Sequence, residues 1–291
     1  MLGEKEFVRS HGMGNDYLVV DGSTFGVPMT PDNVRRICDR HCGVGSDGTL
    51  ELLQAPEGFD AAVRIYNPDG SEAEKSGNGV RIFAKFCIDH GYADARGSLR
   101  IHTLGGSVHA ELISRRADHS VFRVHMGRVS FRCEDLPMVG AEEWIQKPLE
   151  VDGCALTVTC LSVGNPHTVV FDAPFDENTV KRYGPLIEQD RHFPKRTNVQ
   201  FVRVASRDTV EALIWERGAG WTLSSGSSAC AVAAACVRSG RTDRNVDVVM
   251  RGGTLKVEVQ DNWEIYQTGR AQEIAQGVLS AELVASLRIA E

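Results

Sequence analysis

The chain has 291 residues, of which 42% are hydrophobic and 24% charged, and this length accommodates one large domain or two of about 130 to 150 residues each. A formal net charge of −7 leaves no surplus of basic side chains to neutralise phosphates, which disfavours nucleic-acid binding and favours a small-molecule ligand. The eight cysteines form no CxxC pair, the first residues carry no apolar leader, and no apolar run approaches the roughly 18 residues of a membrane span. We therefore expect a cytoplasmic protein with reduced thiols and no membrane contact.

The predicted elements begin with a strand that opens on a Gly-Asn pair, in "GNDYLVVD" from Gly14 to Asp21. The later stretch "GVGSDG" satisfies GxGxxG, but it follows the helix-like "VRRICDRH" and not a strand, so it does not indicate a dinucleotide site. Next, "RIYNPDGSEAEKSG" leads into "NGVRIFAKFCIDHG", an apolar, helix-like run that closes on a glycine suited to a C-cap. No paired His or Cys stands at metal-ligand spacing, so we expect no metal.

Each of these features recurs later in the chain. "GNPHTVVFD" begins at Gly164, "LIWERGAGWTLSSG" places Ile214 where the first copy has Ile65, and "SSACAVAAACVRSG" follows Ser225 as the first helix follows Ser76. The offsets agree to within one residue, because 164 minus 14 is 150, 214 minus 65 is 149, and 225 minus 76 is 149. A nearly constant offset through three pairs indicates an internal repeat of two structurally equivalent halves.

The repeat predicts an α+β (mixed α/β) fold of two pseudo-symmetric domains, each a sheet wrapped around a central helix, with the active site in the cleft between them. Alternating segments at 121–131, 155–163 and 246–260 predict strands, and the helix after each Ser-Gly corner is apolar nearly all round, which is typical of a buried helix. We expect domains at residues 1–125 and 126–270. The apolar spacing in the final segment, 271–291, favours a terminal helix that packs back on the first domain.

Ser76 and Ser225 stand at the expected N-termini of the two central helices. The first turn of a helix carries N–H groups without intrahelical partners and the positive end of the helix dipole, so two such turns at one cleft would bind a carboxylate. A side chain at each corner could then remove a proton from one face of an α-carbon and return it to the other. Either serine alone is better explained as an N-cap, and the repeat is what favours the catalytic interpretation.

Five segments of the chain together resemble the diaminopimelate epimerase family. They are "HGMGNDYLVVDG", "YNPDGSEAEKSGNG", "VGNPHTVV", "FPKRTNVQF" and "ERGAGWTLSSGS". The resemblance extends from about residue 7 to residue 270, in order and with consistent spacing. It implies an isomerase that needs no pyridoxal phosphate and interconverts LL- and meso-diaminopimelate by two-base α-proton transfer, in lysine and peptidoglycan-precursor biosynthesis. It also implies an amino-acid substrate, no cofactor, and a homodimer.

The resemblance assigns roles to individual residues. The two base positions, which are cysteines in the family, are occupied here by Ser76 and Ser225, while His167 and Glu216 fall where the family has residues that assist the bases. Arg217 would bind the distal carboxylate of the substrate through both arms of its guanidinium, with Glu216 near the distal ammonium. The matching substrate-binding positions are Asn15, Asn67, Gly77, Asn78, Asn165, Asn198, Arg217, Gly226 and Ser227.

Two departures from the family pattern set the open questions. Trp221 replaces an acidic residue usual in its segment, which predicts a reshaped cleft. A serine hydroxyl is a much weaker acid than a thiol and needs an adjacent base, so the loss of both cysteines predicts an impaired or inactive epimerase. Three alternatives remain: targeted replacement of both cysteines in an epimerase; a divergent racemase, isomerase or dehydratase that acts on another amino acid; and a non-catalytic amino-acid-binding pseudoenzyme.

Overall fold

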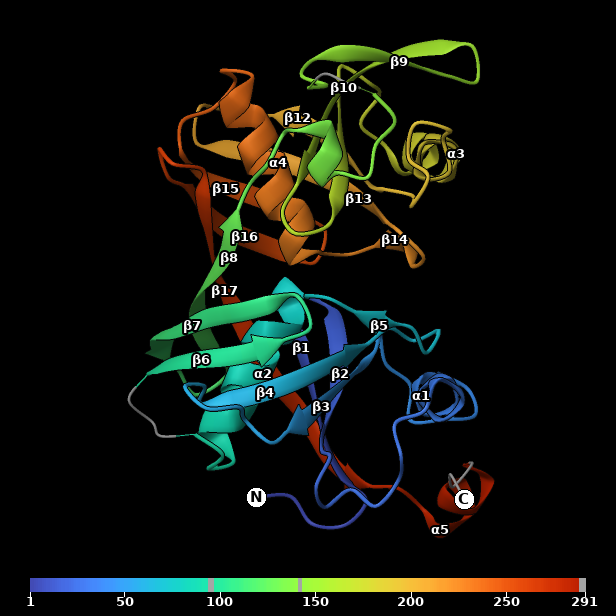
Figure 1. The fold of residues 1–291 in the computed structure, drawn as a ribbon, viewed down its shortest axis with the longest axis vertical. Coiled ribbons are helices and arrows are strands. Elements are labelled where there is room, and N and C mark those ends of the chain that lie inside the picture. The colour runs from blue at the N-terminus through green and yellow to red at the C-terminus, as the bar shows by residue number, and fades with distance from the viewer. Residues whose placement is uncertain (94–96, 141–142, 288–291) are drawn as a thin grey trace. The chain divides into compact units, whose positions relative to one another are not determined.

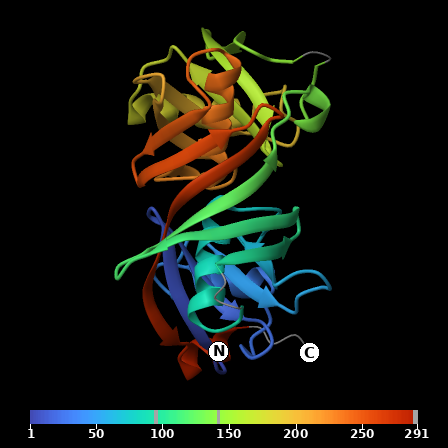
Figure 2. The ribbon, with the colours of Figure 1, turned by 90° about the vertical axis from the view of Figure 1, so that its left-hand side faces the viewer.

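The computed structural model describes residues 1–93, 97–140 and 143–287, and the chain divides into two compact units. The first unit comprises Met1–Val124 and Gly269–Glu291, and the second comprises His125–Thr268. Both boundaries lie inside long strands, β8 (Ser120–Arg128) and β17 (Glu264–Val278), in which the chain passes from the first unit to the second and back (Figure 1, Figure 2). The second unit is therefore one continuous stretch of chain, and the first is assembled from two.

The strands of the first unit pair in the order β17, β1, β2, β3, β4, β6, β7, and β5 pairs with β4 as well. The β2–β3 and β4–β6 pairs are parallel, and the other pairs are antiparallel. In β6, buried and exposed residues alternate strictly, as expected for a sheet with one covered face. The bounds are β1 (Glu6–Gly12), β2 (Asn15–Asp21), β3 (Thr49–Leu53), β4 (Ala61–Tyr66), β5 (Glu72–Ala73), β6 (Ser98–Thr103) and β7 (Gly106–Arg115).

Helix α2 (Gly77–Asp89) is the helix around which these strands are built (Figure 1). Residues 77–84 are buried without interruption, which a helix with one solvent face would not show. The helix contacts β1, β2, β4 and β7. The prediction of a buried central helix after the first Ser-Gly corner is confirmed.

The second unit has the same arrangement around helix α4 (Gly226–Arg238). Its strands pair in the order β9, β10, β11, β12, β13, β15, β16, β17, with β14 on β13, and the β11–β12 and β13–β15 pairs are parallel. Residues 229–236 of α4 are fully buried, and their small side chains, mostly alanine, let the surrounding strands approach closely. The bounds are β9 (Lys147–Val151), β10 (Cys154–Ser162), β11 (Pro166–Phe171), β12 (Asn198–Val204), β13 (Thr209–Glu216), β14 (Gly220–Thr222), β15 (Asn245–Met250) and β16 (Gly253–Val259), with the 3-10 helix η1 (Cys133–Asp135) before them.

The registers of the two sets of strands show that the repeat is structural. Leu18 pairs with Thr49 across β2–β3, and Thr168 pairs with Val199 across β11–β12. Both numbers differ by 150, since 168 minus 18 and 199 minus 49 give the same value. The predicted mixed α/β fold of two pseudo-symmetric halves is confirmed.

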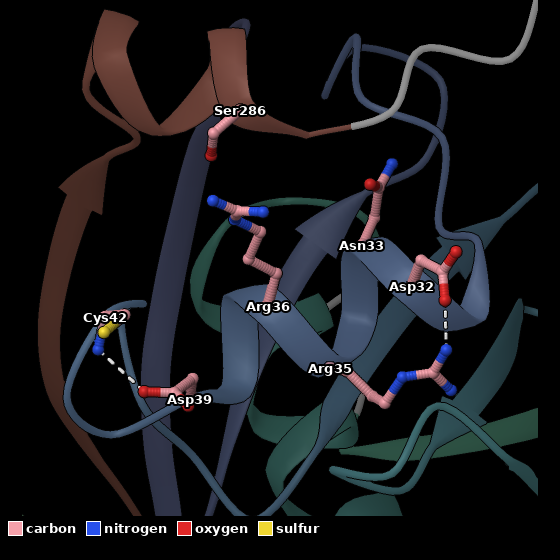
Figure 3. A pocket seen from close by; sticks show the side chains of 7 residues that line it. All are labelled: Asp32, Asn33, Arg35, Arg36, Asp39, Cys42 and Ser286. Atoms are coloured by element: carbon pink, nitrogen blue, oxygen red, sulfur yellow. Dashed lines mark hydrogen bonds and ion pairs between the residues drawn. The ribbon is translucent and has the colours of Figure 1, made fainter.

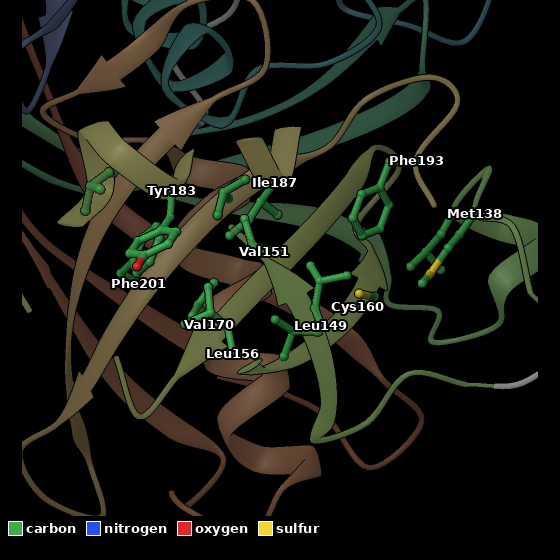
Figure 4. Close-up of a cluster of buried hydrophobic side chains, with 14 of the residues drawn as sticks. Met138, Leu149, Val151, Leu156, Cys160, Val170, Tyr183, Ile187, Phe193 and Phe201 are labelled. Atoms are coloured by element: carbon green, nitrogen blue, oxygen red, sulfur yellow. The ribbon is translucent and has the colours of Figure 1, made fainter. Parts of the chain in front are cut away.

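Besides the two central helices, the described residues form three further α-helices: α1 (Pro31–Cys38), α3 (Glu177–Glu188) and α5 (Ala281–Ser286). Each begins after a side chain that accepts a backbone N–H bond, namely Thr30, Asp176 and Ser280. Helix α3 packs on β9, β12, β13 and β14, and its apolar side chains join a buried cluster with those of neighbouring strands (Figure 4). In the described ranges, no helix is both long and apolar enough to cross a membrane.

The terminal segment differs from the expectation in part. Residues 271–278 belong to strand β17, which pairs with β1 at residues 272–278, and the helix is confined to Ala281–Ser286. Leu279 and Leu287, one on each side of that helix, are buried in the apolar core of the first unit. Residues 288–291 of the predicted segment lie outside the described residues.

Candidate active site

Helix α2 begins at Ser76, whose side-chain oxygen has two partners. Ser76 Oγ accepts a hydrogen bond from the Gly79 N–H at 3.0 Å, which is the usual N-cap contact. The Tyr17 hydroxyl, on β2, lies 3.2 Å from the same oxygen. Ser76 is half-buried, whereas Gly77 and Asn78 are buried. The first corner thus places a hydroxyl beside the first turn of a helix, where negative charge is favoured.

Asn15 and Asn78 are joined in a chain of hydrogen bonds whose direction is fixed at both ends. Arg81 Nη2 donates to Asn78 Oδ1 at 2.5 Å, and Asn78 Nδ2 donates to Asn15 Oδ1 at 3.1 Å. Asn15 Nδ2 donates to Asp47 Oδ2 at 3.1 Å, and Asp47 is paired with Arg40 at 2.7 Å. A guanidinium only donates and a carboxylate only accepts, so the orientation of both amides follows from the two ends. The structure therefore brings two predicted substrate-binding amides together at the first corner.

Asn67 is not part of this chain. Its Nδ2 donates to Ser71 Oγ at 3.0 Å, and its backbone N–H donates to the Ser71 carbonyl at 2.8 Å. These bonds close the turn between β4 and β5, and within the described ranges the Asn67 side chain bonds to no other predicted site residue. Its role as a substrate contact stays a prediction.

Helix α4 begins at Ser225, in the equivalent position of the second unit. Ser225 Oγ accepts from the Ser228 N–H at 3.4 Å and lies 3.4 Å from Ser227 Oγ. Ser225 is 3% exposed, and Gly226 after it is buried. The second corner repeats the N-cap of the first, but its hydroxyl partner is a serine and not a tyrosine.

His167 is fully buried on β11, and both of its ring nitrogens are hydrogen-bonded. Nε2 lies 2.9 Å from Asn165 Oδ1, and Nδ1 lies 3.1 Å from Gln200 Nε2. Because an amide nitrogen can only donate, Nδ1 accepts and the neutral ring donates from Nε2 to Asn165. Burial, followed by the positive charge of Arg217, lowers the pKa of His167 to about 3, and the hydrogen bond from Gln200 opposes the shift. Gln200 also donates to Ser228 Oγ at 3.0 Å, which connects His167 to the first turn of α4.

Asn198 fixes the turn that carries Arg217. Asn198 Oδ1 accepts from the Arg217 N–H at 3.0 Å, and Asn198 Nδ2 donates to the Pro166 carbonyl at 2.9 Å. The guanidinium of Arg217 donates to the Lys195 carbonyl at 3.3 Å. Glu216 is the last residue of β13 and precedes Arg217 directly. The structure thus brings Asn198 and Arg217 into contact, with Glu216 next in the chain.

Glu188, a buried carboxylate on α3, holds the same turn from the other side. It accepts from the Gly218 N–H at 3.1 Å and from Trp215 Nε1 at 2.7 Å. Trp221, the departure noted in the sequence, pairs with Trp215 across β13–β14. The guanidinium of Arg251 lies 5.4 Å from the centre of the Trp221 ring. The turn that carries Glu216 and Arg217 is therefore fixed by buried contacts on both sides.

Tyr17, Arg81 and Gln200, which bond to the corners, and Glu188, which holds the turn of Arg217, were not predicted. The repeat contained a usable signal for Tyr17, because it occupies the position of His167 in the first half (167 minus 17 is 150). Arg81 gave a second signal, since a guanidinium in a helix that is otherwise buried requires polar partners. Glu188 and Gln200 gave none, because isolated polar residues are most often exposed.

Each corner combines a hydroxyl, the N-terminal turn of a buried helix and amide side chains held in one orientation. Such groups can bind a carboxylate and stabilise negative charge that develops beside it. Within the described ranges, neither hydroxyl is hydrogen-bonded to a carboxylate or an imidazole, and Ser76 alone of the two has an ionisable partner, Tyr17. Over the same residues, no group of three or more His, Cys, Asp or Glu side chains is placed to hold a metal ion.

The surface pocket in Figure 3 lies elsewhere in the first unit. It is bordered by α1, the loop that follows α1, and α5, and its lining residues are Asp32, Asn33, Arg35, Arg36, Asp39, Cys42 and Ser286. Arg35 pairs with Asp32, and Asp39 accepts from the Cys42 N–H at 2.7 Å. No predicted site residue lines this pocket, and its two basic and two acidic side chains balance. It is not the candidate active site.

Comparison with known proteins gives consistent results for sequence and fold. The sequence matches the diaminopimelate epimerase family over residues 7–132 and 159–274. It is 41% identical over 281 residues to diaminopimelate epimerase 2 of Nostoc sp., covering 96% of this chain and 97% of that protein, and 41% identical over 277 residues to diaminopimelate epimerase of Synechocystis sp., covering 93% and 97%. The fold is similar to that of a probable proline racemase from Agrobacterium radiobacter K84, with a TM-score of 0.71 at 14% identity over 95% of this chain and 93% of that chain.

Proposed function

The chain belongs to the diaminopimelate epimerase family, and from this premise we propose that it binds diaminopimelate at its two Ser-Gly corners. One observation supports this above all: Ser76 and Ser225 cap the two central helices at equivalent positions of the repeat. A two-base α-proton transfer requires two acid–base groups, one for each face of the α-carbon, and the repeat provides one equivalent corner in each unit. We propose that these serines stand where the family has its two bases.

The substrate contacts that we propose divide into two sets. The reacting carboxylate would be held by the first helical turns, at residues 77–78 and 226–227. The distal amino-acid end would be held by Arg217 and Glu216, and the backbone bond from Arg217 to Asn198 supports a fixed position for this pair. The remaining proposed contacts are the amide side chains of Asn15, Asn67 and Asn165.

His167 supports this site without acting as its base. With a pKa of about 3, the ring is neutral at pH 7, and both nitrogens already have partners. We propose that His167 assists by orienting Asn165 and, through Gln200, the first turn of α4. Glu216 is then the remaining residue that we propose to assist the proton transfer.

The serines set the expected rate. A thiol has a pKa near 8.5, which a helix N-terminus lowers further, whereas an alcohol needs an adjacent base before it can accept a proton. General acid–base catalysis is worth about 10² to 10⁴-fold per well-placed group. We propose that this chain retains the substrate site but epimerises diaminopimelate far more slowly than a protein with both cysteines.

We propose that the protein works in the cytoplasm, as a homodimer in a biosynthetic pathway. The family relation supports a place in lysine and peptidoglycan-precursor biosynthesis, and it alone supports a homodimer. None of the eight cysteines, all of which lie in the described residues, forms a disulfide, which supports a reducing, cytoplasmic environment.

The test is exchange of the α-proton of LL- and meso-diaminopimelate for deuterium in D₂O, followed by proton NMR. The protein is compared with a Ser76→Cys/Ser225→Cys variant, and with Ser239→Cys, which adds a thiol at the opposite end of α4, as the control. We expect the double-cysteine protein to exchange the proton at least about 100-fold faster than the parent, and the control to match the parent. If no variant exchanges the proton and calorimetry detects no binding of diaminopimelate, the proposal fails, and another amino acid becomes the candidate ligand.

A further inference from the structure

The hydrogen bond between Tyr17 and Ser76 joins a buried phenol to the first corner. Tyr17 lies on β2 and is 6% exposed, and its hydroxyl is 3.2 Å from Ser76 Oγ. Ser76 Oγ also accepts from the Gly79 N–H, so the serine proton is free to point toward the tyrosine oxygen. The corner therefore contains two hydrogen-bonded hydroxyl groups, that of Ser76 and the more deeply buried phenol of Tyr17.

Gly48 makes room for the tyrosine ring. A Cβ at residue 48 would lie 2.7 Å from Cε1 of Tyr17 and 2.3 Å from the Tyr66 carbonyl oxygen, which no side chain could occupy without displacement. Gly48 also has a φ of +155°, which side-chain-bearing residues rarely adopt. The backbone bond from the Leu18 N–H to the Gly48 carbonyl, at 3.1 Å, fixes the loop against β2. The ring is thus held in place from a second element.

The second corner has no such partner. The position equivalent to Tyr17 is His167, which is linked to α4 through Gln200 and Ser228, and in the described part of the chain it forms no hydrogen bond with Ser225. The hydroxyl beside Ser225 is that of Ser227, which is no stronger an acid than Ser225 itself. The two corners share a fold and differ in proton chemistry.

We propose that Tyr17 is the proton acceptor for Ser76, an inference that rests on the proposed function. A phenol has an ordinary pKa near 10, far below that of an alcohol, so negative charge is more stable on Tyr17 than on Ser76. In the forward step, the tyrosine phenolate takes the hydroxyl proton of Ser76 while Ser76 Oγ takes the α-proton. The α-C–H bond breaks, its electron pair stays on the substrate as an enolate, and the helix N–H groups stabilise that charge.

The reverse step restores every group. Ser76 returns a proton to the α-carbon and receives one from the Tyr17 hydroxyl, which becomes the phenolate again. One negative charge moves between Tyr17 and the substrate, and no other reactant is consumed. In this proposal Tyr17 acts through Ser76, to which it is hydrogen-bonded, so it is a positioning residue. Because only a small fraction of a phenol is ionised at pH 7, about one part in a thousand at its ordinary pKa, this route is slow by nature.

The test compares deuterium exchange in four proteins: the parent, Tyr17→Phe, Ser76→Cys and Tyr17→Phe/Ser76→Cys. LL- and meso-diaminopimelate are used separately, because each base removes the proton from one face. In the serine background we expect Tyr17→Phe to lower the maximal exchange rate on one of the two substrates about 100-fold, with a nearly unchanged half-saturating concentration. In the cysteine background the thiolate needs no proton acceptor. There, Tyr17→Phe should lower the maximal exchange rate only about fivefold, which corresponds to the loss of one hydrogen bond.

Tyr92→Phe serves as the control, since that hydroxyl also forms a hydrogen bond in the first unit but to the Leu2 N–H. If Tyr17→Phe lowered the exchange rate equally in the serine and the cysteine background, Tyr17 would only shape the corner, and the proposal would be overturned. Exchange by Ser76→Cys/Ser225→Cys with none by the parent would also overturn it while leaving the proposed function intact. Absence of exchange from every protein, with no binding of diaminopimelate, would remove the proposed function and this inference together.

Discussion

At the scale of single residues, His167 makes the stability of the fold depend on pH. Its pKa is 6.5 for an unperturbed side chain and about 3 in the folded protein. Between these values the unfolded chain binds a proton that the folded chain does not, so the stabilisation is complete above pH 6.5 and is lost as the pH falls toward 3. The free energy of unfolding should fall by up to about 1.4 kcal/mol per pH unit from this residue alone.

Urea unfolding at pH 7 and pH 4.5 measures this contribution. We expect His167→Gln to be less stable than the parent at pH 7, and to lose less stability than the parent on acidification. His41→Gln, which changes an exposed histidine, should retain the pH dependence of the parent. Identical pH slopes for the parent and His167→Gln would show that the ring is protonated in the folded state.

The residue scale is also where the sequence was least informative about the site. The segment "NPH" is typical of a turn, and the residues next to His167 in the sequence do not indicate that its ring is buried with both nitrogens hydrogen-bonded. Burial, followed by the charge of Arg217, lowers its pKa, and the hydrogen bond from Gln200, 33 residues later, sets its tautomer. The serine corners could be located because a helix N-cap is a local signal. Charge and protonation depend on residues that only the tertiary fold brings close.

At the scale of elements, α2 carries a buried guanidinium that should control substrate affinity. Arg81 donates to Asn78 Oδ1, and this bond orients the Asn78 amide so that its Nδ2 group points toward Asn15. Arg81→Met removes the donor while keeping most of the volume, so the amide can rotate. We expect diaminopimelate to bind at least about tenfold more weakly by calorimetry, the value of a hydrogen bond to a charged group.

Two variants separate orientation from helix stability. Arg81→Lys keeps a charged donor and should bind with intermediate affinity. Lys85→Met lies on the same helix, removes its pair with Asp89, and should leave the affinity unchanged. If Arg81→Met bound diaminopimelate as the parent does, with a thermal unfolding transition that shows a folded protein, the hydrogen-bond chain would have no part in binding.

Element prediction succeeded where the pattern was local and failed where packing overrode it. The central helices follow from mainly apolar runs after a cap, and their burial confirms that interpretation. Helix α3 was not predicted, because Gly184 and Pro185 within it are usual helix breakers. A Cβ at Gly184 would lie 2.7 Å from the Trp215 ring, so close packing against β13 accounts for the glycine. The strand at 271–278 was likewise missed, since its partner β1 is at the other end of the sequence.

At the scale of the whole molecule, the path of the chain gives the two units unequal independence. The second unit is continuous from His125 to Thr268, whereas β1 of the first pairs with residues 272–278, and Leu279 and Leu287 complete its core. We therefore expect a fragment of residues 125–268 to fold alone, with dispersed amide signals in a nitrogen–proton NMR spectrum. A fragment of residues 1–124 should stay unfolded until a peptide of residues 269–291 is added, because without it a sheet edge and an apolar surface are left open. A folded, monomeric 1–124 fragment would mean that the strand from the far end of the chain closes the first unit without stabilising it.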